Sequence, residues 1–242
     1  MANPLSHAWR SYRSNMRLVL LSALALAIAF LIPVFASLPT YNDLGGIFVR
    51  TASLYLNLNL FNSAIIIVAL LFSLLFLSFA IVVMNVVVKS DRTHTRVKTE
   101  VLRALEQYTG MVFVVLLLYT IVILAANALA YRTGYSAIAT IIAALLLAPL
   151  VFYAPSSIII DERGISNAMR ASVGFFLKRF DYFVIWLAVS ILMLTILDLV
   201  AVGVGGALLS GYLMLVLSSV FVLPFLLLLQ GQLYISRFKL LG

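Results

Sequence analysis

The chain has 242 residues, of which 64% are hydrophobic and only 10% charged, and its mean hydropathy is +1.18. Soluble domains carry about 25% charged residues, so this composition predicts an integral membrane protein. Lys and Arg outnumber Asp and Glu by 16 to 8, which gives a net charge of +8. The sequence contains no cysteine, and this excludes disulfides, iron–sulfur clusters, thiolate zinc sites and a cysteine nucleophile.

Six apolar stretches are long enough to cross a bilayer as helices, which takes roughly 20 residues. The predicted spans are residues 18–38, 60–88, 111–130, 136–160, 183–202 and 208–233. We therefore predict an all-α fold, a polytopic bundle of six transmembrane helices in one domain, residues 1–242. The apolar run of the first span exceeds the roughly 7–15 residues of a signal peptide, which favours a retained helix. Before the second span, the alternation from Leu54 to Leu60 suits either a short extended segment or the frayed start of that span.

The positions of Lys and Arg predict the orientation, because these residues are retained on the cytoplasmic side. Fourteen of the sixteen lie in the two terminal tails and in the second-to-third and fourth-to-fifth connections, and only Arg50 and Arg132 lie opposite. This asymmetry predicts a multi-pass protein of the cell membrane with both termini in the cytoplasm. It also accounts for the positive charge without nucleic acid as a partner.

The cytoplasmic segments before the first and fifth spans share one helical pattern. Residues 5–10 and 165–170 have Ser, Ala and Arg in register, and their apolar residues recur on one helix face. A weaker copy begins at Lys98. We predict three units, each an amphipathic cytoplasmic helix capped by its Ser or Thr and followed by a transmembrane hairpin. The predicted units are residues 1–90, 91–160 and 161–242. The alternative is chance similarity, because basic connections that enter a membrane are commonly amphipathic.

The most distinctive stretch runs from Tyr153 to Ser172. A proline near the inner end of the fourth span is followed by aliphatic residues and an acidic residue, and then by a helix with Ala, a basic residue and Ser. The positions of this pattern are Pro155, Ile158, Ile159, Asp161, Ala168, Arg170 and Ser172. The stretch resembles a group of prokaryotic six-span membrane proteins of unknown function, related to the membrane region of some glycerophosphodiester phosphodiesterases. The resemblance implies a six-span architecture. It does not indicate an activity, because the catalytic domain of those enzymes is soluble and is not matched.

The same stretch predicts a sharp corner between the fourth and fifth spans. Pro155 removes a backbone donor and is expected to kink or end the fourth span. Asp161 and Glu162 are expected at the start of the following helix, where its dipole favours negative charge, and Arg163 or Arg170 is expected to pair with them. The residues of this predicted structural corner are Pro155, Asp161 and Ser172. A ligand or partner site is the alternative.

Few polar residues lie inside the predicted spans. Asp198 is the only acidic one, and an intramembrane carboxylate is a candidate for proton or cation passage. Its place near the outer end of the fifth span also allows contact with interfacial water. The candidate intramembrane polar site comprises Asp198, Asn127, Asn85 and Gln230. The amides equally suit interhelical hydrogen bonds, and Pro33, Pro149 and Pro224 are expected as packing kinks or as the broken helices of a transporter site.

The sequence carries no catalytic, cofactor-binding or metal-binding motif, and its histidines, His7 and His94, lie outside every span. We predict a non-catalytic membrane protein, an accessory subunit or membrane-organising scaffold, whose basic cytoplasmic face binds anionic lipid or an acidic partner. The candidate contacts are Arg10, Arg13, Arg17, Arg163, Arg170, Lys178 and Arg179. Expected partners are membrane lipids, another membrane protein or a second copy of the chain. The alternative function is a transporter or channel for a small solute or lipid.

Overall fold

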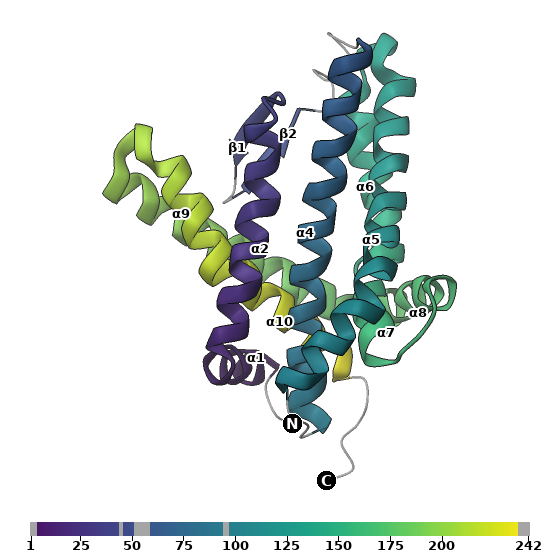
Figure 1. The fold of residues 1–242 in the computed structure, drawn as a ribbon, viewed down its shortest axis with the longest axis vertical. Coiled ribbons are helices and arrows are strands. Elements are labelled where there is room, and N and C mark those ends of the chain that lie inside the picture. Colours follow the sequence, from purple (N-terminus) through teal and green to yellow (C-terminus); the bar gives the residue numbers. More distant parts are fainter. Residues whose placement is uncertain (1–3, 44–45, 51–58, 94–96, 237–242) are drawn as a thin grey trace.

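A computed structural model of the chain describes residues 4–43, 46–50, 59–93 and 97–236. The fold is helical apart from one β-hairpin (Figure 1). The helices are α1 (Pro4–Ser14), α2 (Met16–Phe35), α4 (Leu60–Thr93), α5 (Val97–Ala130), α6 (Ser136–Val151), α7 (Ala154–Ile160), α8 (Ile165–Lys178), α9 (Phe180–Leu217) and α10 (Leu223–Ile235). The shorter elements are the strands β1 (Thr40–Asp43) and β2 (Gly46–Val49), the 3₁₀ turn η1 (Tyr131–Thr133) and the π-helical turn η2 (Ser218–Val222).

Six helical segments of the described residues are long and apolar enough to cross a membrane. They are Met16–Phe35, Leu60–Asp91, Glu100–Ala130, Ser136–Ile160, Phe180–Val204 and Ser210–Ile235. Each overlaps one predicted span, so the prediction of a helical protein with six candidate spans is confirmed. The helices α4 and α5 have 34 residues each. This is about 50 Å of helix, and both must extend beyond a hydrocarbon core of about 30 Å.

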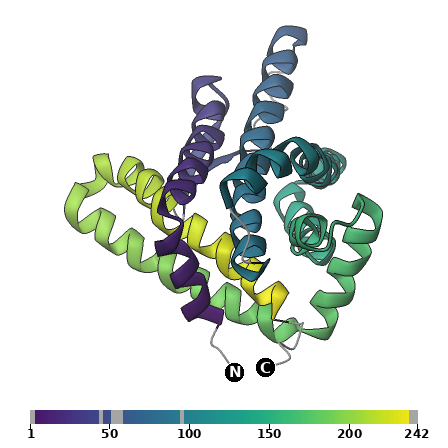
Figure 2. The same ribbon diagram turned by 60° about the horizontal axis from the view of Figure 1, so that its bottom comes forward.

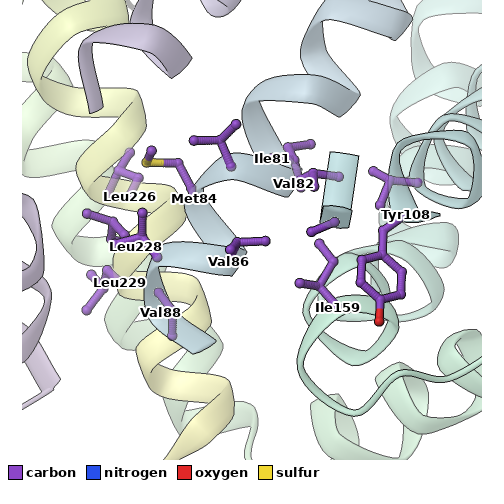
Figure 3. Close-up of a cluster of buried hydrophobic side chains, with 14 of the residues drawn as sticks. Ile81, Val82, Met84, Val86, Val88, Tyr108, Ile159, Leu226, Leu228 and Leu229 are labelled. Atoms are coloured by element: carbon purple, nitrogen blue, oxygen red, sulfur yellow. The ribbon is translucent and has the colours of Figure 1, made fainter. Parts of the chain in front are cut away.

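The core lies at one end of the bundle, which we call the base. The base carries α1, the last turns of α4, the start of α5, α7, α8 and the end of α10. Every residue of α4 from Ile81 to Val88 is buried there, as are the residues of α7 from Ala154 to Ile159. Figure 3 shows Met84 and Val88 beside Leu228 and Leu229 of α10, and Ile159 and Tyr108 on the other side of α4. The base ends of the second, third, fourth and sixth candidate spans therefore form one apolar core.

Helix α10 passes close to α4 at a glycine. A Cβ added to Gly231 would lie 3.1 Å from a methyl group of Val88 and 3.4 Å from the Asn85 amide oxygen. Figure 2, which brings the base forward, shows α10 (yellow) between α1 (purple) and the end of α4. Gly231 thus allows the closest approach between the second and sixth spans.

The three predicted amphipathic segments pack around this core. α1 contacts α10, the start of α5 contacts α4 and α7, and α8 contacts α6 and α7. The residues in register with Ala8 are Val101 and Ala168, and the exposed fractions of the three are 0%, 4% and 0%. The middle segment is not a separate helix, because α5 continues from Val97 to Ala130 without a break. The predicted unit boundaries stay a prediction.

The β-hairpin was not predicted. Thr40 pairs with Val49, and Tyr41 with Phe48, across two antiparallel strands. The signal for it was Asn42-Asp43 shortly before Gly46, because these residue types favour hairpin turns. Most of the alternating segment before the second span lies outside the described residues; α4 itself starts at Leu60.

Helix α9 contains the whole fifth candidate span and the first part of the sixth. The helix is continuous from Phe180 to Leu217. Both ribbon views show α9 bending back on itself between its two spans and projecting away from the other helices. The first of these spans, Phe180–Val204, is the least enclosed in the described chain.

Candidate functional site

A ring of polar side chains surrounds the core at the base and joins its helices. The members of this polar ring are Ser11, Asn15, Lys89, Asp91, Asp161, Glu162, Arg163, Gln232 and Tyr234. Its contacts lead from α4 to the segment after α7, from there to α10, and through α1 back to α4. The polar ring therefore joins the base ends of the second, fourth and sixth candidate spans.

The contact between α4 and the segment after α7 is an ion pair. Lys89 Nζ donates to Glu162 Oε1 at 2.6 Å and lies 5.9 Å from the centroid of the Tyr108 ring. The hydrogen bond from Lys89 lowers the pKa of Glu162 below its usual value. Glu162 has a φ of 55°, a left-handed conformation that costs a non-glycine residue of order 1–3 kcal/mol. The ion pair thus accompanies a strained turn that directs the chain from α7 into α8.

The contact between the segment after α7 and α10 is centred on Asp161. Tyr234 OH donates to Asp161 Oδ2 at 2.7 Å, and Arg163 Nε lies 3.4 Å from the same oxygen. The Asp161 side chain is only 8% exposed. Tyr234 is fully buried and stacks on Tyr153, with ring centroids 5.8 Å apart. The carboxylate of Asp161 is therefore engaged inside the protein.

Helix α1 completes the polar ring. Gln232 Nε2 donates to Ser11 Oγ at 3.3 Å, and Ser11 Oγ donates to the carboxylate of Asp91. Asn15 Nδ2 lies 3.5 Å from Asp91 Oδ1. Ser11 itself is 3% exposed. The α1 helix is thereby joined to both α10 and α4 by polar contacts, of which those of Ser11 are part-buried and that of Asn15 is exposed.

A serine bridges the break between α6 and α7. The helical pattern stops at Phe152 and Tyr153, and Ser172 Oγ of α8 accepts a hydrogen bond from Tyr153 N–H at 3.0 Å. The same hydroxyl donates to the carbonyl of Pro149 at 2.7 Å. Ser172 therefore stands in the place of the helical hydrogen bond between these two backbone groups. Gln230 Nε2 of α10 donates to the neighbouring carbonyl of Phe152.

Hydroxyl groups also donate hydrogen bonds to backbone carbonyls that two other prolines leave without a helical donor. Tyr12 of α1 donates at 2.9 Å to the carbonyl of Val220, four residues before Pro224, a residue that has no N–H to offer. Ser73 of α4 donates at 2.5 Å to the carbonyl four residues before Pro33. Neighbouring hydroxyls are one of the ways in which membrane helices tolerate proline. These contacts support the prediction of packing kinks.

Two details of the predicted corner are wrong. Asp161 and Glu162 do not begin the following helix, because α8 starts at Ile165 after Gly164. They lie in the connection, where the left-handed turn at Glu162 separates the two helices. The predicted cap is also absent in α8, since Gly164 occupies that position and Ser166 lies inside the helix. Of the two expected arginine partners, Arg163 pairs with Asp161.

The four predicted intramembrane polar residues lie in three separate places. Asn85 accepts a hydrogen bond from Ser156 at 2.7 Å, and Gln230 also lies at the base. Asn127 donates to Thr140 at 2.8 Å near the opposite end of α5 and α6. Asp198 lies on the exposed side of α9 and has no hydrogen-bond or ion-pair partner among the described residues. The structure does not assemble them into one site, so the geometry does not favour the transporter alternative.

The predicted basic contacts divide into two groups. Arg163 pairs with Asp161, and Arg179 pairs with Asp181 at 3.2 Å and lies 3.6 Å from the centroid of the Tyr182 ring. The hydrogen bond to Asp181 raises the pKa of Arg179. The other five are exposed and form no ion pair within the described part of the chain. We call these five the basic rim: Arg10, Arg13, Arg17, Arg170 and Lys178.

Aromatic and aliphatic side chains lie beside the basic rim. An open hollow of about 510 Å³ on α1 is lined by Ser6, Trp9, Arg10, Arg13 and Ser14. The Trp9 ring stacks on Tyr12 at 5.8 Å, yet the side chain is 55% exposed. Leu177 and Phe180, next to Lys178 and Arg179, are also exposed. Basic residues interleaved with exposed apolar ones are typical of a surface that lies at the headgroup level of a membrane.

Much of the polar ring was not predicted from the sequence. Lys89, Asp91 and Ser11 were not among the predicted site residues. The sequence did contain a signal for charged residues at the ends of α4 and α7. The apolar part of α4 is followed directly by Lys89-Ser90-Asp91, and that of α7 by Asp161-Glu162-Arg163. The hydrogen-bond partners on α1 and α10 are distant in sequence and carry no such signal.

Among the described residues, no group of three or more His, Cys, Asp or Glu side chains is placed to hold a metal ion. Comparisons with protein-family models, curated proteins and solved structures found no match. The resemblance to the prokaryotic six-span group therefore stays a prediction that rests on the residues quoted for it.

Proposed function

We propose that this polytopic membrane protein is a non-catalytic scaffold that binds anionic lipid at the cytoplasmic leaflet through its basic rim. The observation that carries the proposal is the separation of charge at the base. The acids Asp91, Asp161 and Glu162 are engaged within the polar ring, whereas the five cations of the basic rim are exposed and form no ion pair within the described chain.

The position of the basic rim suits lipid phosphate. Trp9 and Phe180 anchor apolar surface beside it, and α1 and α8 are held against the core by buried residues. Each Lys or Arg near an anionic surface contributes about 1 kcal/mol, and this attraction is screened by salt. A rigid array of five such charges gives selectivity for anionic headgroups without a closed pocket.

Lipid selectivity tests the proposal directly. The protein is reconstituted with spin-labelled phosphatidylglycerol or phosphatidylcholine, and the motionally restricted lipid fraction is measured by electron paramagnetic resonance. We expect preference for phosphatidylglycerol at low salt and its loss at high salt. Arg13→Gln should weaken that preference by up to about fivefold, the equivalent of 1 kcal/mol. The control is Arg50→Gln, at the opposite end of the bundle. Equal restriction of both lipids by the unchanged protein contradicts the proposal.

The orientation is tested separately, and the cysteine-free sequence makes this simple. Ser166→Cys, on α8, should react with a membrane-impermeant maleimide only after the cells are opened. Thr133→Cys, in η1, should react in intact cells. The reverse pattern would place the basic rim outside the cell and remove the cytoplasmic part of the proposal.

A further inference from the structure

The fifth candidate span has two different faces. Its inward face carries Trp186, Val189, Met193 and Leu197, which pack against the main core. Trp186 Nε1 also donates to the carbonyl of Leu226 in α10 at 2.9 Å. Despite these contacts, only 6% of the residues in its most apolar 18-residue stretch are buried, compared with 56% in the sixth span and 39% in the first. Most of its surface therefore has no partner in the described chain.

The outward face of this span is broad, and one line of residues along it, which we call the seam, contains Asp198. Ile191, Thr195, Asp198 and Val202 are all exposed, and their spacing of four, three and four residues places them on one side of the helix. Ile191 is 56% exposed and Val202 is 51% exposed. This is the periodicity with which helices pack against one another in pairs.

Asp198 makes the seam unfavourable in lipid alone. Six residues separate it from the end of the candidate span at Val204, about 9 Å along the helix. No described donor or cation contacts its carboxylate. Acidic residues inside spans are rare, and they face protein or pair with a complementary group, because hydrocarbon does not solvate charge. The carboxylate therefore indicates that a group covering the seam carries a positive charge or a hydrogen-bond donor.

A second copy of this chain does not supply that chemistry. In a two-fold dimer through this seam, each Asp198 would approach the other at the same depth, and like charges repel. None of the six candidate spans contains Lys or Arg in its outer half. A cation that meets Asp198 at its own depth is therefore not supplied by the spans of this chain.

We infer that the outward seam of α9 docks a transmembrane helix of a different membrane protein, one that carries Lys or Arg at the depth of Asp198. Ile191 and Val202 pack against that helix above and below the charge pair. Thr195, one turn from Asp198, offers a hydroxyl to the same cation. This interface is independent of the basic rim, which lies at the base.

Photo-crosslinking in native membranes tests the inference. A photoreactive amino acid replaces Ile191 on the seam, or Val189 on the inward face as the matched control, and the adducts are identified by mass spectrometry. We expect position 191 to crosslink to a transmembrane segment that contains Lys or Arg, and position 189 to crosslink only within the chain. Asp198→Leu should reduce the intermolecular adduct at least tenfold, whereas Thr195→Val should reduce it less.

A defined probe provides the second arm. A synthetic leucine-rich transmembrane helix with one Lys at the matching depth is co-reconstituted with the full chain, and association is followed by energy transfer. The Lys probe should associate at least tenfold more strongly than an all-leucine probe, and Asp198→Leu should abolish the difference. Adducts with lipid only, with a second copy or with a span lacking a cation overturn the inference, as does equal association of both probes.

Discussion

The most apolar 18 residues of the fifth and sixth candidate spans have nearly the same mean hydropathy, 2.5 and 2.6, yet 6% of these residues are buried in the fifth span and 56% in the sixth. The sixth has a glycine where α4 approaches, and its Gln230, Gln232 and Tyr234 bond to other elements at the base. The fifth directs one carboxylate away from the protein. Because lipid is as apolar as leucine, hydrophobicity inserts both spans but does not decide which one packs. Small residues and buried polar pairs decide it.

The strongest test of this comparison is a matched pair of leucine truncations. Leu228 in the sixth span is fully buried, whereas Leu192 in the fifth is 61% exposed. Leu228→Ala should lower the free energy of unfolding by about 2–5 kcal/mol, because it leaves a cavity in the core. Leu192→Ala should change it by less than about 0.5 kcal/mol. Equilibrium unfolding in mixed detergent micelles measures both, and equal losses would mean that the two spans are equally packed.

A smaller effect is expected at the bridged break between α6 and α7. Ser172→Ala leaves Tyr153 N–H and the Pro149 carbonyl without their shared hydroxyl, and should cost about 0.6–2 kcal/mol. Ser166→Ala, on the exposed side of the same helix, is the control and should be close to neutral. The same unfolding assay applies. A Ser172→Ala protein as stable as its control would show that the break needs no bridge.

The smallest effect concerns pH. The pKa of Glu162 is lowered in the folded protein, so its ion pair with Lys89 stabilises the fold fully above the usual carboxyl pKa of about 4.3. That stabilisation is lost as the pH falls through the lower folded-state pKa. Since Glu162 is largely exposed, the effect should stay below about 1 kcal/mol. Glu162→Gln should flatten this part of the pH profile of unfolding; an unchanged profile would assign the acid sensitivity to other groups.

Different parts of the site were predictable to different degrees. The break near Pro155 and the importance of Ser172 followed from residue types, because proline lacks the backbone donor that a continuing helix uses. The role of Ser172 did not follow, since its partners are Tyr153 and Pro149 on another helix. Arg163 was a candidate both for the basic surface and for pairing with an acid, and it pairs with Asp161. Arg179 was expected only at the basic surface, but it pairs with Asp181, two residues away in sequence.

The amino-acid sequence by itself determined the number of candidate spans and the concentration of basic residues at one end. Because that number is even, it also predicted that the two chain ends lie on the same side. These follow from the transfer of each segment between water and lipid, which depends only on that segment's own residues. Only the tertiary structure decided that the second, third, fourth and sixth candidate spans share a core, that hydroxyls from other helices bond to the carbonyls near prolines, and that Asp198 lies on an uncovered face. Those outcomes depend on steric fit and on polar pairing between residues far apart along the chain, for which local composition carries no information.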